Sequence, residues 1–241
     1  MEGGLVGRPR SGRIFTARRR VRLDDMDRKG RTRLDALARF MQDVAIDDVD
    51  ETGWGAPDHL WFVRRIRVDV VRPFVADRAL EIVTWCSGSA TAAAGRRWTI
   101  TGDAGGLAEV DSVWIHLGPD ARPARIEGFG VYEEAAGGRT VSTGVTLPGP
   151  PPEAPRRPWP LRRTDVDLHG HVNNAVVWQA VEDVLGVDLG LARPLSARVD
   201  FLRPLDGGDD VFVTRWDDGP SGILALETAD GPHAVAAVTP A

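Results

Sequence analysis

Apolar residues recur every three or four positions in two separate stretches of the chain, which predicts two amphipathic helices. The first helix is expected to begin near Leu34 and to stop at Gly53, and the second to follow Asn173 or Asn174 and to stop at Gly186. Asparagine favours helix starts, and glycine favours helix ends. The apolar stripes are Leu34, Leu37, Met41, Val44 and Ala45 in the first helix and Ala175, Val177, Trp178, Val181 and Leu185 in the second.

Ten shorter stretches bounded by turn residues predict β-strands. In each half of the chain, one strand precedes the helix and four follow it. The expected strands are 18–23, 64–71, 80–85, 96–101 and 109–116 in the first half and 159–163, 196–202, 211–216, 223–228 and 234–238 in the second. Consecutive strands joined by short loops form antiparallel sheets, so each half is predicted to be an α+β unit whose sheet wraps one long helix.

The two halves are copies of one structural unit. Residues 22–44 align without gaps with residues 162–184, and residues 67–85 align without gaps with residues 198–216. Both blocks occur in the same order and share arginine, aspartate, glycine, proline and tryptophan positions. Internal repeats of this kind define the architecture, so the sequence predicts two tandem units.

The repeat suggests where each unit begins and ends. We expect a flexible tail over residues 1–17, an N-terminal unit over 18–146, a linker over 147–158 and a C-terminal unit over 159–241. The linker region is rich in proline, which favours an extended and stiff connector. Nine extra residues fall between helix and next strand in the first unit, roughly 53–61. Two interpretations of this insert stay open, a pocket wall and a surface loop.

The two units differ where chemistry would be expected. The second unit carries His169, His171, Asn173 and Asn174, whereas the first unit has Lys29, Arg31, Arg33 and Leu34 at the matching positions. Imidazole can act as a base near neutral pH, and the free N–H groups of a helix N-terminus can stabilise an oxyanion. This polar cluster directly before the second helix is therefore the candidate site. Asp167 has an aspartate counterpart, Asp27, and by this pattern alone it would only shape the turn.

Composition narrows the function further. The net charge of −5 and the lack of a long apolar run argue against nucleic-acid binding and against a membrane span. A single cysteine, Cys86, cannot form an internal disulfide and fits a cytoplasmic protein. Two neighbouring histidines without a further ligand set predict neither a metal site nor a cofactor. The chain also lacks the Gly-x-Ser-x-Gly motif of serine hydrolases and has no phosphate-binding loop.

Basic residues gather at the start of the first unit. They are Arg18, Arg19, Arg20, Arg22, Arg28, Lys29, Arg31 and Arg33. A basic surface of this kind can attract an acidic partner, and it can equally be a solvated face.

The stretch from Asp165 to Asn174, which reads D-V-D-L-H-G-H-V-N-N, resembles the D-x-D-x-x-x-H-V-N-N motif of acyl-acyl carrier protein thioesterases. In the first unit, Q-D-V-A at 42–45, W-F-V-R-R-I-R-V-D at 61–69 and S-V-W-I at 112–115 are similar to the N-terminal half of that family. The resemblance covers most of residues 18–238. It implies two tandem hotdog units, the first binding the acyl chain and the second catalytic.

The resemblance also implies an activity, the hydrolysis of a fatty acyl-acyl carrier protein thioester to release a free fatty acid. Asp167 and His171 match the family's catalytic aspartate and histidine, and His169 stands where plant members have asparagine. Pro204 stands where plant members have glutamate, and Glu182 is the nearest substitute in sequence. The catalytic candidates are Asp167, His169, His171, Asn173 and Glu182, and the substrate-binding candidates are Leu37, Phe40, Met41, Trp61 and Asn174.

Several alternatives share these features. An acyl-CoA thioesterase would use the same cluster with a nucleotide-binding pocket in place of a docking surface for the acidic acyl carrier protein. A hotdog dehydratase would use a histidine and a carboxylate for proton transfer, and a non-catalytic acyl-thioester-binding protein would need only the pocket. Because two hotdog units already supply the interface of a dimer, we expect either a monomer that acts as a pseudo-dimer or a homodimer of such chains.

Overall fold

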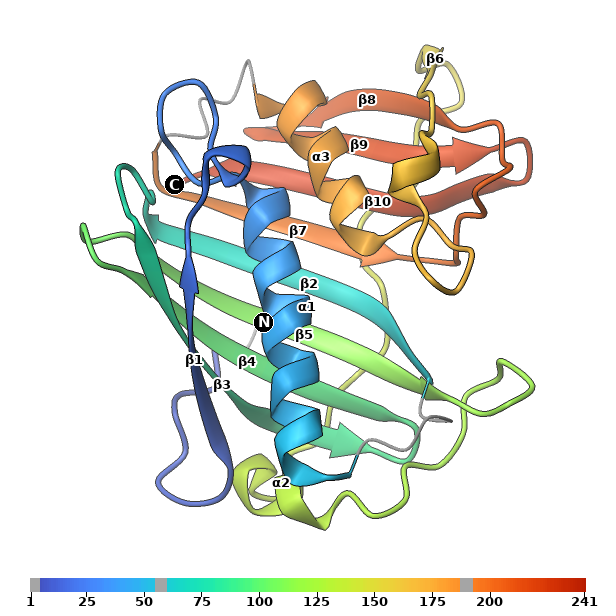
Figure 1. Cartoon of the computed structure of the whole chain (residues 1–241). Coiled ribbons are helices and arrows are strands. Elements are labelled where there is room, and N and C mark those ends of the chain that lie inside the picture. The colour runs from blue at the N-terminus through green and yellow to red at the C-terminus, as the bar shows by residue number, and fades with distance from the viewer. Residues whose placement is uncertain (1–4, 55–59, 187–192) are drawn as a thin grey trace.

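The computed structural model describes residues 5–54, 60–186 and 193–241, so the middle of the insert at 53–61 lies outside the described residues. Two long helices lie on one face of a single antiparallel sheet (Figure 1). The ten strands of the described sheet follow the order β1-β3-β4-β5-β2-β7-β10-β9-β8-β6. This arrangement confirms the predicted α+β class, with one helix against each half of the sheet. No helix among the described residues is long and apolar enough to cross a membrane.

The two halves contain matching elements. The first half consists of β1 (Ile14–Arg20), η1 (Leu23–Asp25), α1 (Leu34–Thr52), β2 (Leu60–Arg72), β3 (Ala79–Ala90), β4 (Ala93–Gly102), β5 (Leu107–Leu117) and α2 (Gly130–Ala136). The second half consists of β6 (Arg156–Pro158), η2 (Arg163–Asp165), α3 (Asn174–Val184), β7 (Leu195–Phe201), β8 (Phe212–Asp218), β9 (Ser221–Thr228) and β10 (Gly231–Pro240).

The starts of both halves differ from the prediction. Strand β1 begins at Ile14, and Arg13 already donates to Asp48 at 2.6 Å, so the expected tail over residues 1–17 is too long. The strand expected over 159–163 is wrong, because the pairing with β8 ends at Pro158 and the chain then enters η2. Short edge strands are poorly marked in sequence, because only one neighbour pairs with them.

The two halves join through strands β2 and β7, which pair antiparallel in the middle of the sheet. Arg67 faces Arg198 in this ladder, and these two residues also align in the repeat. A pseudo-two-fold axis therefore passes between them and relates the two halves. Each arginine is neutralised by an aspartate two positions later, since Arg67 binds Asp69 at 2.9 Å and Arg198 binds Asp200 at 2.9 Å.

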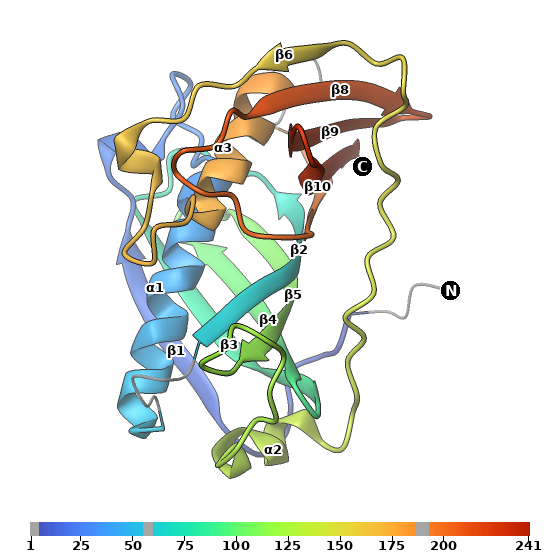
Figure 2. The same ribbon diagram turned by 90° about the vertical axis from the view of Figure 1, so that its right-hand side faces the viewer.

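The segment that connects the halves runs extended along the sheet face opposite the helices (Figure 2). The buried carboxylate of Asp200 accepts the backbone N–H groups of Thr146 and Leu147, both at 3.1 Å. Arg64 and Arg65 donate to the carbonyl oxygens of Thr143 and Gly144, both at 3.0 Å. The connector is thus bound to the outer face at the seam between the halves.

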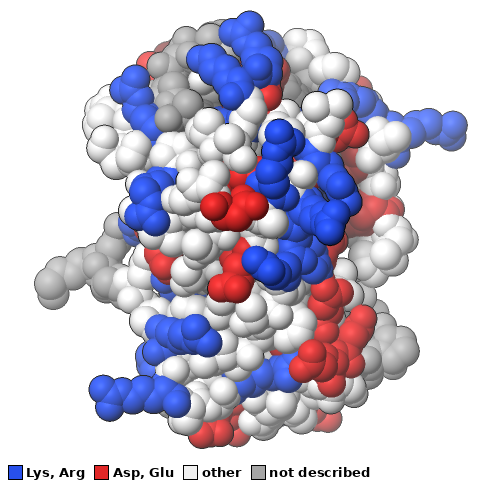
Figure 3. Space-filling model, turned by 60° about the vertical axis from the view of Figure 1, so that its left-hand side comes forward, with Lys and Arg blue, Asp and Glu red and all other residues white. Residues whose placement is uncertain are grey.

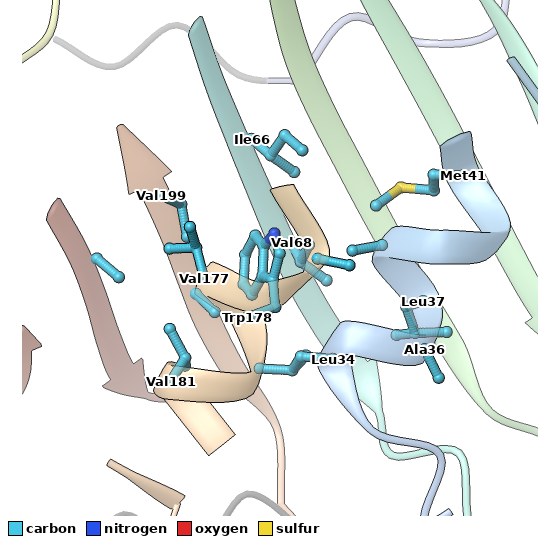
Figure 4. Packing of buried hydrophobic residues seen from close by; sticks show 14 of the residues in the cluster. Leu34, Ala36, Leu37, Met41, Ile66, Val68, Val177, Trp178, Val181 and Val199 are labelled. Atoms are coloured by element: carbon cyan, nitrogen blue, oxygen red, sulfur yellow. The ribbon is translucent and has the colours of Figure 1, made fainter. Parts of the chain in front are cut away.

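The helices pack on the sheet through the residues that the helical spacing identified. Leu37, Met41, Trp178 and Val181 are each at most 4% exposed. Figure 4 shows how side chains of the two helices meet those of β2 and β7 in one layer, with Leu34 of α1 facing Val181 of α3. Because both helices share this layer, the two halves have one common core.

The seam generates a prediction about stability. Replacing Asp200 by alanine removes the partner of Arg198 and frees the connector, and should lower the free energy of unfolding by about 3 kcal/mol. The matched variant Asp69→Ala should cost only about 1 kcal/mol, because Asp69 is 20% exposed and contacts Arg67 and Ser196 rather than the connector. Urea denaturation measures both values. Equal losses would contradict the role assigned to the connector.

Candidate active site

The loop before each long helix has the same backbone shape in both halves. In the second half, Asp165 accepts the N–H of Arg162 at 2.8 Å and Asp167 donates its N–H to His171 at 2.8 Å. Asp25 and Asp27 make the matching contacts in the first half, at 2.8 Å each. Gly170 adopts a φ of 82°, a backbone conformation that favours glycine. The shared aspartates and glycine therefore shape the loop.

Asp167 is engaged in this loop. One of its oxygens accepts the N–H groups of His169 and His171, at 2.9 Å and 3.3 Å. Asp27 accepts the N–H groups of Lys29 and Arg31 in the same way, at 2.8 Å and 3.0 Å. Burial opposes the charge on Asp27, but these hydrogen bonds and the charge of Arg31 lower the pKa of its carboxyl.

In the first half, a buried arginine fills the position that corresponds to the candidate histidine. Arg31 contacts Asp27 at 3.1 Å and donates both terminal nitrogens to Glu182 on α3, with the two distances at 3.0 Å and 2.5 Å. Glu182 also accepts the backbone N–H of Leu34, the first residue of α1, at 2.7 Å. Burial works against the guanidinium, but Glu182 and Asp27 raise the pKa of Arg31. The N-terminus of α1 is thereby occupied by a carboxylate.

In the second half, His171 has a different partner. Its Nδ1 lies 2.7 Å from an Oδ1 of Asp206, in the loop between β7 and β8. Both side chains are exposed, at 47% and 67%. An isolated backbone bridge between the same two residues keeps the loops together, as does the N–H of Val172, which donates to Leu205 at 2.8 Å. The result is an accessible carboxylate–imidazole pair directly before α3.

The N-terminus of α3 is open, in contrast to that of α1. Asn173 caps the helix by accepting the N–H of Ala175 at 2.9 Å. Within the described residues, the backbone N–H of Asn174 has no protein acceptor, whereas its counterpart in Leu34 binds Glu182. Asn174 also lines a small hollow together with Val172, Val177, Phe62, Phe201, Arg203, Pro204, Leu205, His233 and Ala234.

The loop that carries Asp206 is held by a buried histidine. His233 lies at the start of β10, with Nδ1 2.5 Å from the carbonyl oxygen of Pro204 and Nε2 3.1 Å from the hydroxyl of Thr228. Its own carbonyl accepts the N–H of Leu202 at 2.8 Å. His233 therefore fixes the chain two residues before Asp206.

The structure brings only part of the predicted catalytic set together. Asp167, His171 and Asn173 share one loop, and His169 lies exposed on the same loop. Glu182 is not the carboxylate beside His171, because Arg31 and the N-terminus of α1 engage it. The ungapped alignment of residues 67–85 with 198–216 sets Asp206 against the apolar Val75. This difference between the two halves is the sequence signal that could have identified Asp206.

The predicted substrate-binding residues lie in two places. Leu37, Phe40 and Met41 face the common core from α1. Trp61 belongs to an aromatic group at the other end of α1, where its ring centroid lies 6.0 Å from that of Trp54 and 5.3 Å from that of His116. Asn174 lies apart from both, beside the candidate site.

An imidazole held by a carboxylate can deprotonate water, and an open helix N-terminus can stabilise a developing oxyanion. The architecture, with one helix on each half of a continuous antiparallel sheet, is that of two tandem hotdog units. The chain belongs to the acyl-ACP thioesterase family. Residues 12–127 match the acyl-ACP thioesterase N-terminal domain, and residues 151–229 match the acyl-ACP thioesterase C-terminal domain.

Individual proteins and solved structures are similar to this chain over most of its length. An uncharacterized protein of Mycobacterium tuberculosis is 30% identical over 215 residues, which cover 87% of this chain and 85% of the relative. An acyl-ACP thioesterase from Bacteroides thetaiotaomicron has the same fold, with a TM-score of 0.79, 13% identity and coverage of 94% of this chain and 97% of that one. The 12:0-ACP thioesterase from Umbellularia californica gives a TM-score of 0.77 at 17% identity, with 94% and 96% coverage. These structures confirm the tandem hotdog fold.

The contact between Glu182 and Arg31 generates a stability prediction. Glu182→Gln should lower the free energy of unfolding by about 2 kcal/mol, because it leaves a buried guanidinium without one of its two carboxylates. Glu51→Gln, which weakens an exposed contact to Arg13 at 3.3 Å, should cost less than about 0.5 kcal/mol. Chemical denaturation compares the two variants. If Glu182→Gln were no more costly than its control, the assigned role of Glu182 would be wrong.

Proposed function

We propose that this protein hydrolyses the thioester of fatty acyl-acyl carrier protein and releases a free fatty acid, with His171 as the general base. The observation that carries the proposal is the 2.7 Å contact between His171 and Asp206 directly before the open N-terminus of α3. Membership of the acyl-ACP thioesterase family supports the reaction class. The first half would bind the acyl chain, and the second half would be catalytic.

The reaction uses the two ring nitrogens of His171 differently. With its Nδ1 proton held by Asp206, the free Nε2 accepts a proton from water as the water oxygen attacks the thioester carbonyl carbon. The tetrahedral intermediate then collapses, the carbon–sulfur bond breaks, and the imidazolium returns its proton to the leaving thiolate. The products are a fatty acid and the free thiol of the carrier.

The N-terminus of α3 supplies the complementary charge. The N–H of Asn174 has no acceptor among the described residues, so it can donate to the oxyanion that forms on the former carbonyl oxygen. The first half supports this assignment, because a carboxylate oxygen of Glu182 occupies the matching position at the N–H of Leu34. The fold can therefore bind a negatively charged oxygen at this place.

The remaining polar residues of the loop support His171. Asp167 holds the backbone N–H of His171, and Asn173 caps α3 and fixes the direction of its first turn. We assign both residues the task of presenting His171 and Asn174 to the same substrate carbonyl. His169 is exposed on the same loop, and we assign its imidazole a contact with the bound thioester.

The acyl chain would extend from the site toward the core of the first half. Leu37, Phe40 and Met41 line the face of α1 that points at the sheet, and apolar side chains of this kind bind a hydrocarbon chain without losing hydrogen bonds. Trp61, in the aromatic group near the far end of α1, would limit how deep the chain can reach.

The proposed chemistry predicts the effect of two substitutions. His171→Ala and Asp206→Asn should each lower kcat by about 100-fold or more, because they remove the base or its orientation. Asp210→Asn, an exposed change on the same loop, is the matched control and should retain full turnover. Thiol release from acyl-carrier and acyl-CoA substrates of several chain lengths measures the rates. Unchanged rates in both variants would rule out this mechanism, and a wild-type protein that binds without releasing thiol would be a binding protein.

We also propose that acyl carrier protein docks on the basic surface at the start of the first half. Figure 3 shows Lys and Arg side chains gathered on one face of the molecule with acidic side chains at their border. Arg31 and Arg33 are not available for docking, because Glu182 and Asp35 engage them. Arg20, Arg22, Arg28 and Lys29 are exposed and form no ion pair within the described parts of the chain. These four residues would attract an acidic carrier.

This docking surface predicts a difference between carriers. The double substitution Arg28→Glu and Lys29→Glu should raise KM for carrier-bound substrates about ten-fold and leave KM for acyl-CoA unchanged. The same charge reversal at the exposed residues Arg122 and Arg125 is the control. Steady-state kinetics at low ionic strength reveals the difference. Equal effects of the two double variants would contradict a docking site at Arg28 and Lys29.

A further inference from the structure

The pseudo-two-fold axis places a further residue at the candidate site. It relates the first turn of α1 to the first turn of α3, so that Leu34 corresponds to Asn174 and Arg31 to His171. In the same alignment, Glu182 on α3 corresponds to Gln42 on α1. The two helices lie side by side, as Figures 1 and 4 show, and each therefore presents its second or third turn to the start of the other.

One of these two symmetric arrangements is seen directly. Glu182 reaches from α3 to the N-terminus of α1, where it binds the N–H of Leu34 at 2.7 Å and the guanidinium of Arg31 at 2.5 Å. The pseudo-two-fold axis relates Glu182 to Gln42, so Gln42 is expected to lie near the N-terminus of α3 and near His171. Gln42 is half-buried and makes no side-chain hydrogen bond within the described residues.

We propose that Gln42 is a further active-site residue, which the first half contributes to the catalytic half. This inference rests on the proposed hydrolysis. The Oε1 of Gln42 accepts a hydrogen bond from the attacking water, whose other proton passes to His171. Three groups thus surround the reacting atoms: the carboxamide of Gln42, the Nε2 of His171 and the N–H of Asn174. None of them has a hydrogen-bond partner among the residues that the structure describes.

The chemical difference between Gln42 and Glu182 explains why only one half is active. In the first half, the carboxylate of Glu182 satisfies both the helix N-terminus and the arginine, so no position is left for a substrate oxygen. A neutral carboxamide at Gln42 does not neutralise the N-terminus of α3. It leaves the N–H of Asn174 available for the negative charge that develops on the thioester oxygen.

The placement of Gln42 can be tested without measuring activity. The double variant Gln42→Glu with His171→Arg transfers the Glu182–Arg31 pair to the other side of the axis. If Gln42 faces His171, the two substitutions should stabilise each other. The change in melting temperature of the double variant should then be about 3 °C more positive than the sum of the changes in the two single variants. The control combines His171→Arg with Ile46→Glu instead. Ile46 lies one helical turn further along α1 and is 59% exposed, so this pair should show no such coupling. The absence of coupling in the Gln42 pair would overturn the placement.

The role of Gln42 is tested by kinetics. Gln42→Met should lower kcat about ten-fold with KM within about two-fold of the wild type, because it removes a hydrogen bond to the reacting water while keeping the side-chain volume. Gln42→Glu should lower kcat further, since its carboxylate would occupy the N-terminus of α3, whereas Ile46→Glu should retain wild-type kcat. Wild-type kcat in Gln42→Met would overturn the role. An inactive wild type would instead contradict the proposed hydrolysis, and the thermal coupling would still decide where Gln42 points.

Discussion

The antiparallel pairing of β2 with β7 is the contact on which the rest of the molecule depends. It sets Arg67 against Arg198 and so makes the two halves face each other about a pseudo-two-fold axis. The same pairing brings α1 and α3 together on one face of the sheet, where they share a single core. Because antiparallel registers alternate buried and outward side chains, a shift of one residue would move that core to the solvent side.

The two ends of the helix pair differ in their charged side chains, and these determine which groups stay accessible at each end. One end contains Arg31 and Glu182, which satisfy each other and close the N-terminus of α1. The other end contains His171 beside Asp206, and no residue in the described parts of the chain accepts the N–H of Asn174 at the start of α3. A closed ion pair stabilises the contact between the halves, whereas an accessible imidazole and an unoccupied backbone donor can act on a bound molecule. Two loops with matching backbone hydrogen bonds thus differ in which groups stay accessible, because a few side chains differ.

The sequence predicted the architecture well, because hydrophobic spacing and repeat alignment depend on local and repeated signals. It located the two helices, the succession of the main strands along the chain and the loop that carries His171. It did not predict the partner of His171, because Asp206 approaches from a separate loop whose position depends on strand register and on the hold of His233. The expectation that Glu182 is the carboxylate beside His171 is wrong for a similar reason. Its distance from His171 along the chain is short, but its helix directs it toward the first half.

The connector bound along the outer face has an evolutionary consequence. In a dimer of identical chains, every substitution appears at both sites, so a change that closes one site also closes the other. A covalent connection, fixed here by Asp200 and the backbone around Thr146, removes that constraint. Each half can then accumulate its own substitutions while the pairing at the seam is retained. The fusion turns a symmetric assembly, in which both sites must stay active, into one in which a single site is sufficient and the other is free to specialise.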